Sequence, residues 1–167
     1  MDELRTLLAT DHRQTLEFFF VHLQDVTEPE VDRRELLYNA SVLAHYAQVS
    51  TCATLDMPTP SSLVRVFDQY VLDQSLASDP EMMETAGAQC LLLAGFFADQ
   101  MRERHNVQWY ARLGAGFYQR AADKSRSEQN ALVMAAMAQH FEPWRQRYTR
   151  LSRELRDQPY LLGTSRN

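Results

Sequence analysis

Histidine and carboxylate side chains are the groups in this sequence that could bind a metal ion. Helical proteins that hold two metal ions carry Glu-x-x-His pairs, which place both ligands on one helix face. The chain contains neither this pair nor His-x-x-x-His. His22 and Asp25 could share a helix face, but such a pair at a helix end is more typical of a solvated contact. Because the histidines are spread over different segments, we predict no metal site and no bound cofactor; they are His12, His22, His45, His105 and His140.

The candidate nucleophiles also argue against catalysis. Cys90 lies in an apolar stretch, where burial would raise the pKa of a thiol and lower its reactivity. Cys52 falls near an expected helix C-terminus, whose partial negative charge disfavours a thiolate. The stretch Gly114-Ala115-Gly116 is too short for a phosphate-binding loop and follows no strand. We predict no catalytic residue, and two free thiols in a reducing compartment.

Positive charge is concentrated at the C-terminal end of the chain. Residues 143–167 hold 6 arginines against 2 acidic residues, a net charge of +4, and residues 1–142 hold 11 basic against 20 acidic residues, a net charge of -9. Three explanations stay open: a solvated face, docking on an acidic protein partner, and contact with RNA phosphates. The acidic body makes nucleic acid the weakest of these. The candidate partner-binding arginines are Arg145, Arg147, Arg150, Arg153 and Arg156.

Three consecutive aromatic residues form a second candidate surface. Phe18, Phe19 and Phe20 fan across about 200° of a helix, so they cannot all face one neighbour. Either the helix is sandwiched inside the core, or one ring is exposed and marks an interface. We therefore add Phe18 to the candidate partner-binding residues, with a homodimer as one possible assembly.

A cleft for a small ligand is the alternative to a protein interface. Its candidate residues are His45 and Tyr46 on one expected helix, and Gly114 and Gly116 on another. Each glycine inside a helix costs about 1 kcal/mol relative to alanine. Close packing against another helix is the main explanation for both glycines, and a ligand lying against bare backbone is the other.

Helices must position all of these residues. The sequence has only 5 Gly and 6 Pro, with 45% apolar and 23% charged residues, which favours a folded helical protein. The stretch from Ala86 to Ala98 carries no charge, and Asp79-Pro80 before it is typical of a helix start. A helix that is apolar on nearly every side must be covered on nearly every side. We predict one all-α domain at 1–157, a bundle of about six helices around a central apolar helix (80–104), followed by a C-terminal tail at 158–167.

The flanking elements follow from local signals. Asp32 is expected to open a helix that runs to about Cys52, and Pro58 and Pro60 mark a loop before a helix that ends near residue 77. Ser125 and Glu128 have the spacing of a capping box, which predicts the start of the last helix. Pro143 should kink or split that helix. Its apolar stripe repeats in steps of three and four residues and comprises Met134, Met137, Phe141, Trp144, Tyr148, Leu151 and Leu155.

Four stretches of the chain resemble a known group of proteins. Residues 91–99 (LLLAGFFAD), 109–110 (WY) and 113–118 (LGAGFY), together with the helix at 37–46, are similar to an uncharacterised family of all-helical proteobacterial proteins. The resemblance implies a bacterial origin and an all-helical fold. The family has no assigned activity, so the resemblance implies none.

The sequence as a whole favours a non-enzymatic protein-interaction module in the cytoplasm. An acidic Met1-Asp2-Glu3 start is unlike a signal peptide, and the longest uncharged run is too short to span a membrane. The aromatic fan, the basic last helix and the tail residues 160–162 (YLL) motivate a protein partner. The alternatives are a helical protein that binds a small ligand or cofactor, with or without enzymatic activity, and RNA binding through the last helix.

Overall fold

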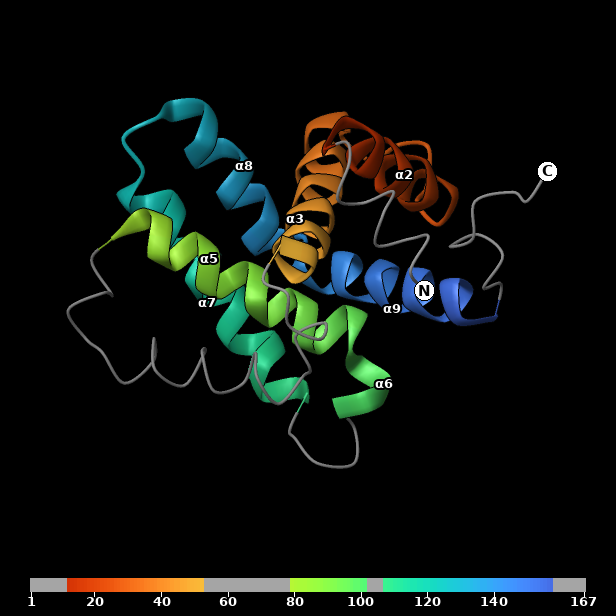
Figure 1. Ribbon diagram of the computed structural model, residues 1–167. Helices are drawn as coiled ribbons and strands as arrows, with labels where there is room; N and C mark the ends of the chain where they lie inside the picture. Colours follow the sequence, from red (N-terminus) through yellow and green to blue (C-terminus); the bar gives the residue numbers. More distant parts are fainter. Residues whose placement is uncertain (1–11, 53–78, 102–106, 158–167) are drawn as a thin grey trace. The chain divides into compact units, whose positions relative to one another are not determined.

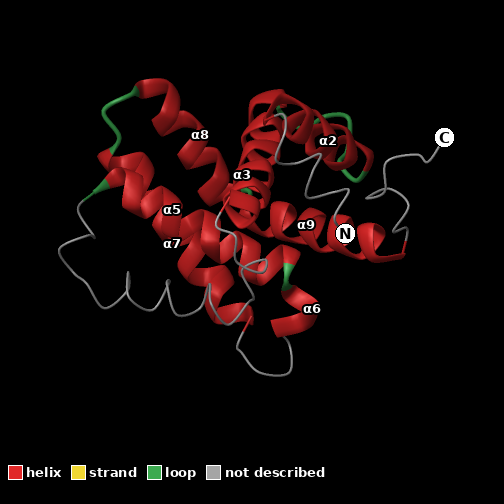
Figure 2. Cartoon of the chain, in the orientation of Figure 1, coloured by secondary structure: helices red, strands yellow, loops and turns green. Residues whose placement is uncertain are grey.

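The computed structural model describes residues 12–52, 79–101 and 107–157 (Figure 1). Within these ranges the chain forms seven α-helices, one π-helical segment and no strand (Figure 2), so the predicted all-α class is confirmed. No helix in the described part is both long and apolar enough to cross a membrane. The tail predicted at 158–167, and the loop and helix predicted between Pro58 and residue 77, lie outside the described residues.

The contacts divide the chain into two compact units. One contains residues 1–58 and 150–167, and the other contains residues 59–149. In the first, α2 (His12–Asp25) packs against α3 (Arg33–Cys52). The predicted opening of α3 is confirmed, because the backbone N–H of Arg34 donates to Asp32 Oδ1 at 2.7 Å. This contact satisfies one of the N–H groups that a helix start leaves without a partner.

The second unit is built on the apolar stretch that the sequence predicts as the central helix. The start is as predicted: Asp79 Oδ1 accepts from the N–H of Glu81 at 2.9 Å, and Pro80 is the first helical residue. The expected continuous helix is wrong, because α5 (Pro80–Leu91) passes into a π-helical segment, η2 (Leu92–Phe96), and then into the short α6 (Ala98–Met101). The N–H of Phe97 bonds to Leu92 O at 2.9 Å, a five-residue step that widens the turn.

Helix α7 (Val107–Lys124) lies beside α5 (Figure 1). The expected close approach is confirmed at Gly114, where an added Cβ would lie 2.4 Å from the Phe141 ring and 2.8 Å from Cys90 Cβ. Gly116 is different, because it is exposed and no described residue lies within 4 Å of an added Cβ. Helix packing therefore accounts for one of the two glycines.

The predicted last helix is two helices, α8 (Glu128–Gln139) and α9 (Phe141–Asp157), separated at His140. Pro143 is the third residue of α9, in the first turn, where a helix does not need the missing N–H. The predicted capping box is wrong: Ser127 caps α8 by accepting from the N–H of Asn130 at 3.3 Å, and Ser125 Oγ instead donates to Ser127 O. The apolar stripe from Met134 to Leu155 is buried throughout.

Candidate functional site

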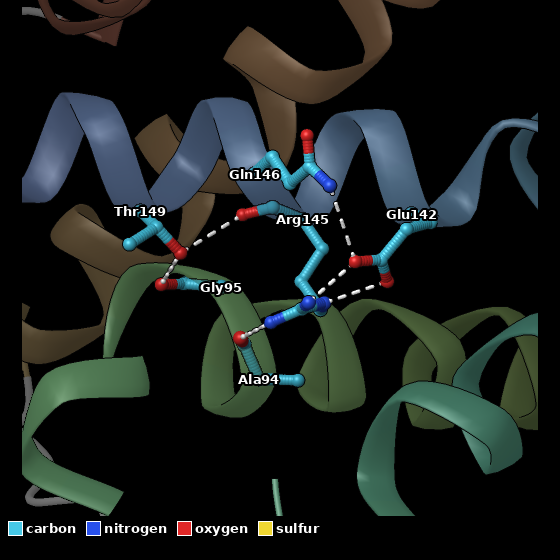
Figure 3. Close-up of polar contacts among 6 residues, drawn as sticks. All are labelled: Ala94, Gly95, Glu142, Arg145, Gln146 and Thr149. Carbon is cyan, nitrogen blue, oxygen red and sulfur yellow. Dashed lines mark hydrogen bonds and ion pairs between the residues drawn. The ribbon is translucent and has the colours of Figure 1, made fainter. Parts of the chain in front are cut away.

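Polar groups inside the second unit gather where α9 meets the π-helical segment (Figure 3). Arg145 Nη1 donates to the carbonyl oxygen of Ala94 at 3.2 Å, and Thr149 Oγ1 donates to the carbonyl oxygen of Gly95 at 2.9 Å. Both carbonyls belong to η2. We call Ala94, Gly95, Glu142, Arg145 and Thr149 the π-clamp. It ties the wide turn of η2 to the first turns of α9.

Gly95 explains why the two elements can approach this closely. A Cβ at Gly95 would lie 2.8 Å from Tyr148 Cβ and 3.1 Å from the carbonyl oxygen of Arg145. Both atoms are fixed to the backbone of α9, so only a residue without a side chain fits. The π-turn also redirects carbonyls away from the regular helical pattern, and side chains of α9 supply donors to two of them.

The positive charge of the π-clamp is already compensated. Arg145 Nε donates to Glu142 Oε2 at 2.8 Å, and Arg145 Nη2 donates to Glu142 Oε1. The hydrogen bonds from Arg145 hold the pKa of Glu142 below its ordinary value. Because the carboxylate and the Ala94 carbonyl occupy the guanidinium, the π-clamp is suited to holding two helices together rather than to binding an anion.

The buried titratable side chains close to the π-clamp are poor catalysts. Burial raises the pKa of the Cys90 thiol, which keeps it protonated at neutral pH. Burial also raises the pKa of the Tyr148 hydroxyl, and the neighbouring Tyr118 raises it further. Among the residues that the structure describes, no three His, Cys, Asp or Glu side chains are grouped so that they could hold a metal ion.

The five candidate arginines divide into two groups. Arg145 belongs to the π-clamp, and Arg147 is buried at 8% exposure with its guanidinium 4.5 Å from the centre of the Trp144 ring system. Arg150, Arg153 and Arg156 are exposed. Arg150 Nη2 lies 3.8 Å from Glu28 Oε1, and both side chains are about half exposed at 52% and 53%. A docking surface on α9 is therefore restricted to the last three arginines.

The other candidate residues lie on two helices, α3 and α7. His45 is exposed on α3, and the adjacent Tyr46 is buried at 9% exposure. The Phe141 ring occupies the space that a side chain at Gly114 would fill, and Gly116 faces solvent on the same helix. The first pair belongs to one compact unit and the second pair to the other.

Phe18 is half-buried, and its ring lies 5.2 Å from that of Phe19 and 4.3 Å from that of His22. Phe19 is buried, and the Phe20 ring has the Arg33 guanidinium at 5.9 Å from its centre. Contacts within the first unit therefore reach all three rings of the aromatic fan.

Of the five π-clamp residues, only Arg145 was a candidate from the sequence, and Ala94, Gly95, Glu142 and Thr149 were missed. The spacing of Glu142 and Arg145, three residues apart on a helix, is a signal that could have revealed their ion pair. The spacing of Arg145 and Thr149 does not reveal that each bonds to a carbonyl of another helix, because that contact needs the π-turn. The nearest available signal was Gly95 itself, a glycine inside an otherwise apolar helical stretch.

The described residues form an all-helical structure, and the π-clamp joins two of its helical segments. Comparison of the chain with protein-family models, with curated proteins and with solved structures finds no match.

Proposed function

We propose that this protein is a non-enzymatic interaction module, in which the C-terminal half of α9 docks on an acidic surface of another protein. The observation that carries the proposal is the exposure of Arg150, Arg153 and Arg156, which follow one another at intervals of three residues. At a rise of 1.5 Å per residue, the first and last of them are about 9 Å apart along the helix. This edge can pair with several carboxylates of one partner at once.

The ion pair between Arg150 and Glu28 is weak enough for a carboxylate of another protein to replace Glu28. Its contact with Glu28 is 3.8 Å long and joins two half-exposed side chains. Exposed pairs of this kind contribute about 0–1 kcal/mol, because water and salt screen them. A partner carboxylate can therefore replace Glu28 at little cost, and the resulting association should be strongly salt-dependent.

The proposed partner is a different protein rather than a second copy of the chain. The aromatic fan offers no fully exposed ring for self-association, since Phe19 is buried, Phe18 and Phe20 are half-buried, and the Arg33 guanidinium lies 5.9 Å from the centre of the Phe20 ring. Nucleic acid is a weak alternative because the chain carries a net charge of -5. The buried free thiol of Cys90 and the resemblance to proteobacterial helical proteins support a bacterial cytoplasmic setting for the proposal.

The test uses acidic probes and a charge-matched control. Helical peptides rich in Asp and Glu are selected by display on the wild-type protein, and their affinities are measured at low and high salt. The triple variant Arg150→Gln, Arg153→Gln, Arg156→Gln should lose at least about 10-fold in affinity and most of the salt dependence. A second variant with the same change in charge serves as the control: Arg13→Gln, Arg34→Gln, Arg126→Gln.

The two variants separate local docking from general charge. If the control weakens binding as much as the α9 variant does, net charge governs the association and the α9 edge is not a docking surface. If the selected peptides bind both variants as tightly as wild type, the proposal is wrong.

A further inference from the structure

Four residues lie together on the solvent-facing side of α7, and packing within the described structure does not account for this combination. Trp109, Arg112, Gly116 and Arg120 follow at steps of three, four and four residues, which places them within about 80° of one another around the helix. All four are exposed, and Trp109 has 43% of its surface open. We call these four residues the Gly116 face. The opposite side of α7 is buried, so a partner can reach this helix only from its solvent-facing side, where Gln108, Gln119, Asp123 and Lys124 are exposed as well.

Gly116 is the least expected member of this face. An exposed glycine inside a helix lowers helix stability by about 1 kcal/mol relative to alanine. Gly114 has a compensating role, because the Phe141 ring occupies the space that its side chain would fill. Gly116 has no such role within the described residues, where nothing lies within 4 Å of an added Cβ. A bare backbone on an open helix face admits close approach by another backbone.

The charges on α7 indicate the chemistry of that second backbone. Arg112 and Arg120 lie about one helical turn on either side of Gly116, and neither has an ion pair within the described part of the chain. Helix α7 has three basic residues and one acidic residue, a net charge of +2, in a chain whose net charge is -5. The acidic residue, Asp123, accepts a hydrogen bond from Gln119 at 3.0 Å. The Gly116 face is thus a basic patch on an acidic protein.

We propose that the Gly116 face binds an acidic helix of another protein, whose backbone crosses α7 at Gly116. Apolar side chains of that helix pack on the Trp109 indole, and two of its carboxylates pair with Arg112 and Arg120. The two arginines are about 12 Å apart along α7, so the carboxylates stand about two helical turns apart when the helices run nearly parallel or antiparallel. Tryptophan and arginine are the residue types that most often dominate the binding energy of protein interfaces, and this face presents one exposed tryptophan and two exposed arginines.

A second copy of the chain fits this surface poorly. A two-fold antiparallel crossing of α7 on α7 at Gly116 would place Arg112 of one copy opposite Arg120 of the other, and like charges in contact are unfavourable. The inference is also independent of the docking proposed for α9, since it uses other residues on another helix.

The first measurement examines the protein alone. The chain has two tryptophans, and Trp144 is fully buried at 0% exposure. Acrylamide should therefore quench mainly Trp109, and the quenchable fluorescence should disappear in Trp109→Phe. If Trp109 is as protected as Trp144 in the free protein, another part of the chain already covers the Gly116 face and the proposal is overturned.

The second measurement examines binding. Helical peptides with randomised Asp, Glu, Ala, Leu, Ser and Lys are selected by display on the triple variant Arg150→Gln, Arg153→Gln, Arg156→Gln, so that the α9 edge cannot contribute. We expect selected peptides to carry two carboxylates about two turns apart and to protect Trp109 from acrylamide. Gly116→Leu should weaken their binding at least 10-fold. The matched control is Gln129→Leu, which adds the same side chain to the exposed face of α8 and should leave affinity unchanged.

Stability measurements keep this test independent of folding. Gly116→Leu replaces an exposed glycine by a better helix former, so it should not lower the stability of the free protein while it weakens binding. A purely structural role for Gly116 would not separate these two effects. Arg112→Gln with Arg120→Gln should also cost about 10-fold in affinity and flatten the salt dependence.

Three further results, from the binding experiments, would overturn the proposal. The first is that no peptide binds below about 100 μM, or that Gly116→Leu does not affect the peptides that bind. The second is a homodimer that Gly116→Leu dissociates. The third is a single-stranded oligonucleotide that competes for Trp109, which would assign the face to nucleic acid. Because the α9 edge is already disabled, each of these results leaves the function proposed for α9 to its own test.

Discussion

The same substitution at two neighbouring glycines of α7 should have opposite effects on stability. At Gly114, a new methyl group would lie 2.4 Å from the Phe141 ring and 2.8 Å from Cys90 Cβ. The Cys90 Cβ is fixed to the backbone, so no change of side-chain rotamer relieves that contact. Overpacking of this kind costs about 1–3 kcal/mol, against about 1 kcal/mol gained from replacing glycine in a helix. We expect Gly114→Ala to lower the free energy of unfolding by up to about 2 kcal/mol.

Gly116→Ala is the matched control. It makes the same gain in helix propensity, and no described residue contacts the new methyl group. We expect a gain of up to about 1 kcal/mol, or a rise in Tm of about 2–4 °C for a chain of this size. Because the gain in helix propensity is common to both variants, they should differ by the cost of overpacking alone, about 1–3 kcal/mol.

Urea unfolding followed by tryptophan fluorescence is the appropriate assay. Trp109 and Trp144 both belong to the unit formed by residues 59–149, so the signal follows the unit that contains α7. Circular dichroism reports on both units, and coincident transitions would show that they unfold together. If Gly114→Ala is as stable as Gly116→Ala, the close approach of Phe141 to α7 is refuted.

Three other predictions concern the π-clamp and its surroundings. Thr149→Val should lower stability by about 1 kcal/mol through loss of the bond to the η2 carbonyl, whereas Thr149→Ser should retain most of it; urea unfolding distinguishes them. Arg145 lowers the pKa of Glu142 in the folded state. The stability that the Glu142–Arg145 pair adds to the folded protein is therefore present above the unfolded pKa of about 4.3, and it is lost as the pH falls through the folded pKa. Glu142→Gln should flatten this part of the stability–pH curve by less than about 1 kcal/mol, since the carboxylate is half exposed; an unchanged curve contradicts the assignment. In a Cys52→Ser background, the Cys90 thiol should react with a thiol reagent only as fast as the protein unfolds around it. Rapid labelling of the native protein would show instead that the Cys90 thiol is accessible.

Short-range chemistry made several features of this protein predictable. The Asp79-Pro80 start of α5 and the Asp32 start of α3 depend on contacts between residues two positions apart, so their sequence signals hold in almost any fold. The burial of the stripe from Met134 to Leu155 follows from helical periodicity alone. The capping box at Ser125 failed because Ser127, two residues later, offers the same side-chain chemistry in the position that the chain uses.

Tertiary contacts decided the features that bear on function. The π-turn at Leu92–Phe96 and the bonds from Arg145 and Thr149 to Ala94 and Gly95 depend on α9 lying against η2, across more than 50 residues of sequence.

The arginines of α9 and the glycines of α7 also show that local sequence does not determine which residues become buried. The five arginines of α9 are chemically identical, and only the packing turns Arg145 and Arg147 inward while it leaves the last three exposed. Gly114 and Gly116 have equal helix propensities, and only the neighbouring Phe141 ring gives one of them a packing role. Residue type and spacing determine which helices form, because those forces act within a few residues. Which side chain meets which is determined by partners that are distant in sequence.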